Sequence, residues 1–197
     1  MQFITATNNQ GKLREMSAIL AKYGIDAISL EQAGVCIEPE ETGDTFYANA
    51  LIKAEAICKE TGKPVIADDS GLCVEALGGA PGVYSKDYGG ENLTDSERCR
   101  FLLEKMEKIE KTELRAAKFV CTIVCLFPDG KILSAAGECH GEISRELMGT
   151  GGFGYDPVFY IKELGKTMAQ LTAQEKNAIS HRGRALEKFA EILSQSL

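Results

Sequence analysis

Acidic side chains suited to acid–base or metal chemistry occur in two short segments, residues 40–43 (EETG) and 68–71 (DDSG). The second segment follows a predicted buried strand. Neighbouring residues on a strand point in opposite directions, so we expect at most one of Asp68 and Asp69 to face a given cleft, while the other bonds to backbone and holds the turn. If Glu41 and one of these aspartates converge, they form the oxygen-rich site that Mg²⁺ prefers. The alternative is that an acid before a helix only complements the helix dipole.

A polar turn near the start of the chain is a candidate anion site, because it follows a predicted strand and opens a predicted helix. That geometry points backbone N–H groups at an anion, and Lys12 adds a positive charge. The turn comprises Thr7, Asn8, Asn9, Gln10, Gly11 and Lys12. It departs from a P-loop, since one glycine is missing and Leu13 stands where a Ser or Thr would hold the metal. An ordinary polar turn is therefore the alternative.

The segment 149–157 (GTGGFGYDP) carries four glycines within six positions, interleaved with aromatic residues. Ordering so many glycines costs conformational entropy, and a structural turn needs only one or two of them. The density therefore indicates backbone wrapped closely around a ligand, with Phe153 or Tyr155 able to stack on a flat ring.

Polar residues on two predicted helices are weaker candidates. Asn49 and Lys53 are four residues apart and share a helix face, which in most proteins faces solvent. Lys176, Ser180 and Arg184 would share one face of a continuous helix, and a basic helix face is usually solvated. His181 is one of only two histidines, and the sequence offers no Ser/His/Asp arrangement for covalent catalysis.

Hydrophobic periodicity predicts the elements that must position these residues. Strands are predicted at 2–6, 64–67, 119–127, 131–136 and 158–161, and helices at 12–23, 44–62, 94–109 and 172–193, the last interrupted around 180–183. Asp44 is the expected N-cap of the second helix, and capping boxes at 94–97 and 172–175 open two others. Strands and helices alternate early and a hairpin lies in the middle, which predicts an α/β protein with a mixed sheet.

Composition limits the function classes. With 22 Lys and Arg against 29 Asp and Glu, the net charge is −7, which argues against a long nucleic acid partner and a polybasic membrane surface. No apolar run approaches the roughly 20 residues of a membrane span, and the N-terminus lacks the pattern of a signal peptide. Seven scattered cysteines without a C-x-x-C pair fit reduced thiols in a cytoplasmic protein. No linker divides the chain, so we expect one domain over residues 1–197.

A phosphate-binding turn, acids for a divalent metal, a glycine–aromatic loop and a basic cluster together describe a nucleotide site. The sequence resembles the noncanonical purine nucleoside triphosphate pyrophosphatases, the inosine/xanthosine triphosphatase family. Five segments in the family's order, covering nearly the whole chain, carry the resemblance: ATNNQGKLREM, ETGDTFYANALIKAEA, VIADDSGLCVEALGGAPGVYS, GTGGFGYDPVF and LTAQEKNAISHRGRAL. Asn8 stands where the family often has glycine, at a position that tolerates variation.

The resemblance implies an elongated mixed β-sheet flanked by helices, in two lobes with a central active-site cleft, and a homodimer. It implies Mg²⁺-dependent hydrolysis of ITP, dITP or XTP to the monophosphate and pyrophosphate. Asp69 would be the general base and a metal ligand, Glu41 would help to hold Mg²⁺, and Ser70 would contact substrate. The other implied substrate contacts are Thr7 to Lys12 and Lys53 at the phosphates, Phe153, Gly154, Tyr155 and Asp156 around the nucleoside, with Phe153 stacking on the base, and Lys176, His181 and Arg182.

Two alternatives stay open at this point. One is a pyrophosphatase for modified pyrimidine nucleotides, as in the neighbouring Maf-like proteins, and the other is a nucleotide-binding module without catalysis. Rejection of adenine by a purine enzyme needs a buried donor aimed at the 6-keto group, from Arg182 or from backbone N–H groups. The sequence identifies no residue that would exclude guanine.

Overall fold

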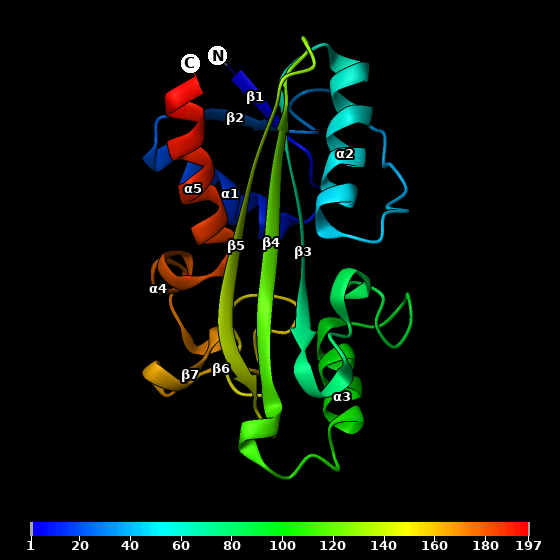
Figure 1. The fold of residues 1–197 in the computed structure, drawn as a ribbon, viewed down its shortest axis with the longest axis vertical. Helices are drawn as coiled ribbons and strands as arrows, with labels where there is room; N and C mark the ends of the chain where they lie inside the picture. Colours follow the sequence, from blue (N-terminus) through cyan, green and yellow to red (C-terminus); the bar gives the residue numbers. More distant parts are fainter. Residues whose placement is uncertain (1, 197) are drawn as a thin grey trace. The chain divides into compact units, whose positions relative to one another are not determined.

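The computed structural model describes residues 2–196, which form a seven-stranded sheet and five α-helices (Figure 1). The strands are β1 (Gln2–Thr5), β2 (Asp26–Ser29), β3 (Val65–Val74), β4 (Ala116–Leu126), β5 (Ile132–Ile143), β6 (Phe159–Ile161) and β7 (Lys166–Thr167). The helices are α1 (Gln10–Lys22), α2 (Phe46–Thr61), α3 (Asp95–Lys105), α4 (Ala173–Ile179) and α5 (His181–Ser196). The strand order is β2-β1-β3-β4-β5-β6-β7. Because β1 is parallel to β2 and β3 while β6 is antiparallel to β5 and β7, the predicted mixed α/β sheet is confirmed.

The chain divides into two compact units. Unit 1 comprises Met1–Ser70, Cys121–Gly137 and Ser180–Leu197, and unit 2 comprises Gly71–Val120 and Glu138–Ile179. The chain passes from one unit to the other within β3, within β4, within β5 and between α4 and α5.

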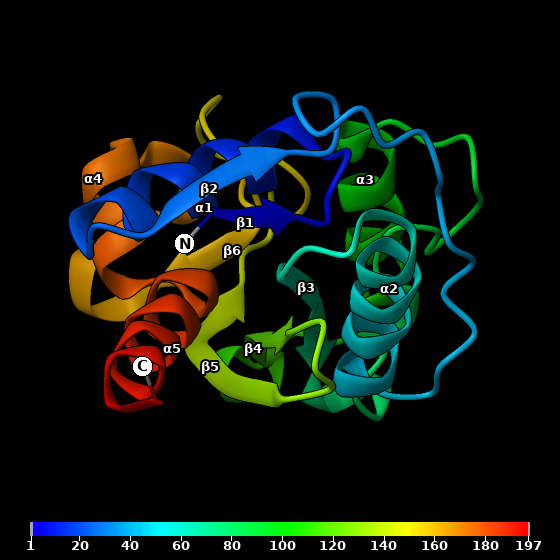
Figure 2. The same cartoon turned by 90° about the horizontal axis from the view of Figure 1, so that it is seen from above.

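Unit 1 buries both faces of its part of the sheet. Phe3 and Ile4 are adjacent on β1 and therefore point to opposite faces. Phe3 belongs to one apolar cluster with Met16 of α1 and Phe189 of α5. Ile4 belongs to a second cluster with Ile57 of α2. Figure 2 shows α1 and α5 on one side of these strands and α2 on the other.

Unit 2 packs α3 against its strands. Leu102 of α3 lies in one apolar cluster with Phe119 of β4 and Phe159 of β6. The buried guanidinium of Arg115 holds the C-terminal end of α3 to β5, since it donates to the carbonyl oxygens of Met106, Ile109, Ile143 and Ser144. The helix begins at the predicted capping box, in which Thr94 and Glu97 bond reciprocally.

Several predicted boundaries differ from the structure. The N-cap of α2 is Thr45 and not Asp44, because the Thr45 hydroxyl accepts from the Ala48 N–H. The strand predicted at 64–67 continues to Val74 as β3, so the DDSG segment lies inside a strand and not in a turn. The strands β2 and β7 were not predicted. The interruption expected near Ser180 is confirmed, since α4 ends at Ile179 and α5 begins at His181.

Within residues 2–196, no helix has both the length and the apolar character needed to cross a membrane.

Candidate active site

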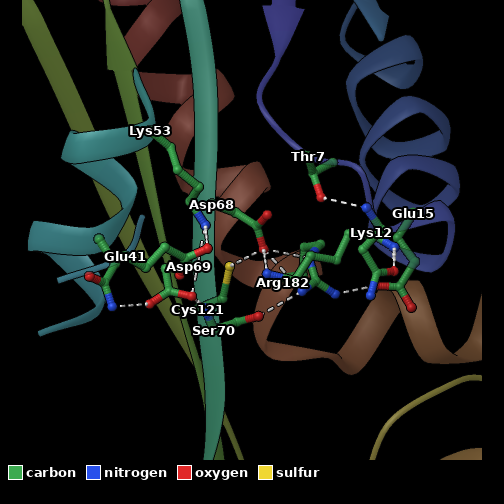
Figure 3. Close-up of polar contacts among 12 residues, drawn as sticks. Thr7, Lys12, Glu15, Glu41, Lys53, Asp68, Asp69, Ser70, Cys121 and Arg182 are labelled. Atoms are coloured by element: carbon green, nitrogen blue, oxygen red, sulfur yellow. Dashed lines mark hydrogen bonds and ion pairs between the residues drawn. The ribbon is translucent and has the colours of Figure 1, made fainter. Parts of the chain in front are cut away.

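The two aspartates of β3 point in opposite directions from the strand, as predicted from the alternation of side chains (Figure 3). The Asp68 carboxylate meets Arg182 and Lys12, whereas the Asp69 carboxylate meets Lys53 from α2. All of these residues belong to unit 1. One strand therefore presents two carboxylates to two different sets of cations.

Asp68 is the centre of a buried ion-pair network. Its Oδ2 accepts from Nε and Nη2 of Arg182 at 3.2 and 3.1 Å, and it lies 3.2 Å from the Lys12 ammonium. Burial disfavours the ionised carboxylate, but these two cations outweigh burial and hold the pKa of Asp68 below its usual range. We expected one of the two aspartates to bond to backbone and hold a turn. Asp69 does accept from the Ser70 N–H, but both residues lie inside β3, so the expected turn is wrong. The Oδ1 of Asp68 is buried without a hydrogen-bond partner.

Arg182 is fixed by more than Asp68. Its Nη1 donates to Glu15 of α1 at 2.5 Å, and its Nη2 donates to the Ser70 hydroxyl at 2.8 Å. The side chain is 1% exposed. A planar guanidinium with several acceptors is held in one orientation, so Arg182 connects α5, α1 and β3 of unit 1 rigidly.

The thiol of Cys121, on β4, completes the surroundings of Asp68. It lies 4.0 Å from Asp68 Oδ2. Burial, together with the Asp68 carboxylate, raises the pKa of Cys121 to about 12. The thiol therefore stays protonated and acts as a weak donor, which excludes it as a nucleophile at neutral pH.

Asp69 lies in a different environment, on the side of α2. Its Oδ1 accepts from the Ser70 N–H at 2.9 Å and lies 3.9 Å from the Lys53 ammonium, and its Oδ2 accepts from the Asn49 amide at 3.2 Å. Asn49 and Lys53 are 2% and 9% exposed, so the expectation that this helix face is solvated is wrong. Their spacing of four residues does place both on one face, and that face packs against β3.

The pKa of Asp69 is shifted toward neutrality. Burial raises it to about 6, although the Lys53 and Lys12 ammonium groups oppose the shift. The carboxylates of Glu41 and Asp68 act in the same direction as burial. Two adjacent aspartates thus have widely separated pKa values, which is the pattern expected where one of them exchanges protons.

Glu41 is brought to Asp69 through Lys53. The Lys53 ammonium lies 3.1 Å from Glu41 Oε1 and also within ion-pair distance of Asp69. The loop that carries Glu41 is anchored to α2, because the Gly43 N–H donates to Asn49 Oδ1 at 2.7 Å. A Cβ on Gly43 would lie 2.7 Å from that same oxygen, so only glycine permits this approach.

Two backbone N–H groups of the 7–12 turn form hydrogen bonds within the turn itself. The Thr7 hydroxyl accepts from the Asn9 N–H, and the Asn9 side chain caps α1 by accepting from the Lys12 N–H at 3.0 Å. Asn8, Asn9 and Gln10 are exposed and Gly11 is buried. The turn is therefore a preformed helix N-terminus, and two of the N–H groups expected to face an anion are bonded internally.

The unit 1 charge cluster combines three cations with four carboxylates. Its members are Lys12, Glu15, Glu41, Lys53, Asp68, Asp69 and Arg182. Each cation lies within 4.0 Å of at least one carboxylate. The cluster therefore has no surplus positive charge for a polyanion, and an added divalent cation would supply it.

In unit 2, the glycine–aromatic loop is held by Asp156 and Lys176. Asp156 Oδ2 accepts from the Phe153 N–H at 2.8 Å and lies 2.5 Å from the Lys176 ammonium. That ammonium also lies 4.5 Å from the centre of the Phe153 ring. The Tyr155 side chain is 4% exposed and donates to the Ser85 carbonyl, so the expectation that Tyr155 could stack on a ligand is wrong. Phe153 is the aromatic residue that remains for stacking.

Packing within unit 2 explains most of the glycine density. A Cβ on Gly149 or Gly151 would lie within 3.0 Å of the Ala169 backbone, and one on Gly152 would lie 2.0 Å from Asp156 Oδ2. These glycines allow close packing within the chain itself, so the density of glycines does not by itself indicate a ligand.

Known proteins resemble this chain in sequence and in fold. The model of the Ham1 family matches residues 3–192. The chain belongs to the Ham1 family. It is similar to the dITP/XTP pyrophosphatases of Bacillus licheniformis (49% identity, 99% of each chain) and Geobacter sulfurreducens (50% identity, 98% of this chain and 96% of the relative). Its fold matches the structure of the Staphylococcus aureus Ham1 protein with a TM-score of 0.88 and 41% identity over the full length of both chains.

In this Ham1 chain, the predicted site residues fall into two groups. Unit 1 brings together Lys12, Glu41, Lys53, Asp69, Ser70 and Arg182, with Thr7 to Gly11 in the turn before α1. His181, also in unit 1, is buried at the start of α5. Unit 2 brings together Phe153, Gly154, Asp156 and Lys176.

The sequence did not predict the observed roles of four site residues of this Ham1 chain, namely Glu15, Asn49, Asp68 and Cys121. Asn49 and Asp68 were recognised but assigned to solvent and to a turn. Glu15 lies three residues after Lys12 and therefore on the same side of α1, which is a signal that was present. Nothing local in the sequence connects Cys121 to Asp68.

A metal in this Ham1 site would depend on few protein ligands. In the described part of the chain, no group of three or more His, Cys, Asp and Glu side chains is arranged to hold an ion. Mg²⁺ usually takes one or two carboxylates together with waters and substrate phosphates. The Glu41 and Asp69 carboxylates lie on either side of the Lys53 ammonium and fit such an ion, and the Glu41 carboxylate contributes to the raised pKa of Asp69.

Proposed function

We propose that this chain hydrolyses noncanonical purine nucleoside triphosphates, dITP, XTP and ITP, to the monophosphate and pyrophosphate. The observation that carries the proposal is the pair Asp68 and Asp69, in which burial raises the pKa of Asp69 to about 6 while cations keep Asp68 ionised. The relatives named dITP/XTP pyrophosphatases support this reaction and this substrate class.

Asp69 is the general base of the proposed mechanism. A base works best when its pKa lies near the working pH, so that it is ionised and still accepts a proton readily. Without a bound metal the pKa of Asp69 is about 6, so Asp69 is mostly ionised at pH 7 to 8, and it is proposed to take the proton from the water that attacks the α-phosphorus. The Asn49 amide and the Ser70 N–H each donate to one of its oxygens and so fix its orientation.

Mg²⁺ is the proposed cofactor, held by Glu41 and Asp69. When bound, the ion neutralises negative charge on the phosphate oxygens. The protein itself adds the positive charges of Lys12 and Lys53. Asp68 positions the Lys12 ammonium, and Glu41 positions the Lys53 ammonium. Because each lysine already has a carboxylate partner, its position is set before substrate binds, which lowers the cost of ordering it.

We propose that the purine base of the substrate stacks on Phe153, while Lys176 and Asp156 support that ring. Hypoxanthine and xanthine carry a keto group where adenine has an amino donor, so a fixed donor selects against adenine. The buried guanidinium of Arg182 already donates to Asp68, Glu15 and Ser70, so backbone N–H groups are the candidate donors. A cytoplasmic homodimer completes the proposal, on the family resemblance alone.

The test compares Asp69→Asn with the wild type in the presence of Mg²⁺. Pyrophosphate release from dITP should fall at least a hundredfold, since general-base catalysis contributes about 10²–10⁴. Binding of dITP, measured by calorimetry, should stay within a few-fold. Asp129→Asn is the matched control, because Asp129 lies in the exposed turn before Lys131 and touches none of the cluster. Near-wild-type turnover of Asp69→Asn would refute the role of Asp69.

A further inference from the structure

The loop that carries Phe153 is also held by α3, a helix that has no role in the proposed mechanism. Gly154 follows Phe153, and its backbone is bonded on both sides to α3 of unit 2. Its N–H donates to Asp95 Oδ2 at 2.6 Å, and its carbonyl accepts from the Cys99 thiol at 3.4 Å. Asp95 and Cys99 are one helical turn apart, so the first two turns of α3 hold the two peptide planes on either side of the Gly154 Cα.

Both of these contacts from α3 are suited to a fixed geometry. Burial raises the pKa of Cys99 to about 12, so the thiol keeps its proton and donates. Asp95 is oriented by Arg98, whose Nη1 lies 3.4 Å from Asp95 Oδ1 and whose Nη2 donates to the Leu93 carbonyl at 2.9 Å. The two carboxylate oxygens of Asp95 therefore have separate partners, one on Arg98 and one on Gly154.

Helix capping does not account for Asp95. The N-terminus of α3 is already capped by the reciprocal bonds of Thr94 and Glu97. The Asp95 side chain is 54% exposed, so its ion pair with Arg98 adds little stability. The contact that distinguishes Asp95 from Glu97, the other acid of this turn, is the bond to Gly154.

The Gly154 N–H belongs to the same rigid peptide plane as the Phe153 carbonyl. Fixing that plane fixes the ψ angle of Phe153, while the bond from the Phe153 N–H to Asp156 fixes the other side of the residue. The Phe153 carbonyl, in turn, accepts from the Asp156 N–H at 3.3 Å. With both flanking peptide planes held, the direction in which the Phe153 ring leaves the backbone is set.

We propose that Asp95 is a positioning residue for base recognition, which holds the Phe153 ring in its stacking orientation through the Gly154 N–H. The inference rests on the proposed function, because it takes Phe153 as the stacking surface for the base. Asp95 acts through Gly154 and Phe153 and contacts neither the phosphates nor the reacting water.

The test measures binding of dIMP, which carries the base, and of inorganic tripolyphosphate, which does not, both by calorimetry with Mg²⁺. Asp95→Ala should weaken dIMP binding roughly tenfold, since base–aromatic stacking accounts for affinity changes of this order. Tripolyphosphate binding should change less than about twofold. In turnover of dITP, KM should rise while kcat at saturation changes little.

Three further variants separate positioning from a structural effect. Asp95→Asn keeps an acceptor for the Gly154 N–H and should restore most of the dIMP affinity. Glu97→Ala breaks the capping box of the same helix without touching Gly154 and should leave dIMP binding unchanged. In a Phe153→Ala background, Asp95→Ala should have no additional effect on dIMP binding, because the two residues act as a unit.

The outcomes distinguish this inference from the proposed function. If the wild type releases pyrophosphate from dITP and binds dIMP, but Asp95→Ala binds dIMP as the wild type does, the positioning role is wrong and the function stands. Equal losses for dIMP and tripolyphosphate, or full additivity with Phe153→Ala, also overturn it. If the wild type neither turns over dITP nor binds dIMP, both proposals fall.

Discussion

Replacing Asp69 by Asn should stabilise the metal-free fold at alkaline pH, because the native carboxylate is ionised at a cost. The folded-state pKa is about 6 against an ordinary value of 3.8. One pKa unit corresponds to about 1.4 kcal/mol, so ionised Asp69 costs the folded state about 3 kcal/mol. The folded protein binds more protons than the unfolded chain between these two pKa values, so the free energy of unfolding falls as the pH rises through that window.

The Asn variant avoids this cost but loses a bond. Its amide oxygen still accepts from the Ser70 N–H, whereas its amino group faces the Asn49 amide and cannot accept from it. Such a loss costs about 1 kcal/mol. The net gain at pH 8 is therefore about 2 kcal/mol, equivalent to a rise in Tm of about 4–8 °C for a chain of this length.

The assay is thermal unfolding in EDTA, followed by circular dichroism at pH 8 and at pH 4, with Asp129→Asn as control. At pH 4 the gain from removing the carboxylate shrinks to about 0.6 kcal/mol and no longer exceeds the lost bond. The Tm advantage of Asp69→Asn should therefore vanish at pH 4, while the control stays close to the wild type at both values. A variant less stable than the wild type at pH 8, or a pH-independent difference, would refute the assignment of a burial-raised pKa.

Three further predictions follow from the same contacts. Arg182→Met leaves the buried Asp68 carboxylate short of a partner and should lower the free energy of unfolding by about 3–5 kcal/mol in urea titrations; adding Asp68→Asn should recover part of the loss, and no recovery would show that the two residues are not coupled. Gly152→Ala should lower the free energy of unfolding by about 3 kcal/mol, because its Cβ would lie 2.0 Å from Asp156 Oδ2. Gly154→Ala, at a φ of +61° with open space around the Cβ, should lower it by about 1 kcal/mol. The reverse order of Tm values would contradict the packing. Removal of Mg²⁺ with EDTA should abolish pyrophosphate release, and Glu41→Gln should raise the Mg²⁺ concentration needed for half-maximal rate, while activity that persists in EDTA would exclude the metal.

Local sequence pattern predicted the scaffold of the site better than its contacts. The capping box at Thr94 and Glu97, the end of α2 at Gly62 and the break near Ser180 are signals within a few residues, and each is confirmed. The extent of β3 is different. Asp68 and Asp69 have the composition of a turn, but a strand continues through them because side chains from α1, α2 and α5 satisfy their charges.

Contacts between distant segments were beyond the reach of local pattern. Arg182 bonds to Asp68 across 114 positions of sequence, and only the fold brings the two together. Likewise, the spacing of Asn49 and Lys53 predicts a shared face, whereas the packing of α2 on β3 decides that this face is buried. The resemblance to a family supplied their roles, which spacing alone could not.

The central claim is that the protein releases pyrophosphate from triphosphates that carry a noncanonical purine base, so product analysis tests it most directly. The wild type is incubated with Mg²⁺ and, separately, with dITP, XTP, ATP, GTP, dUTP and a methylated pyrimidine triphosphate, and both pyrophosphate and phosphate are quantified. The account predicts one pyrophosphate and one monophosphate per molecule of dITP or XTP, and far slower turnover of the other nucleotides. Release of phosphate in place of pyrophosphate, or equal turnover of ATP or of the pyrimidine nucleotides, would contradict it.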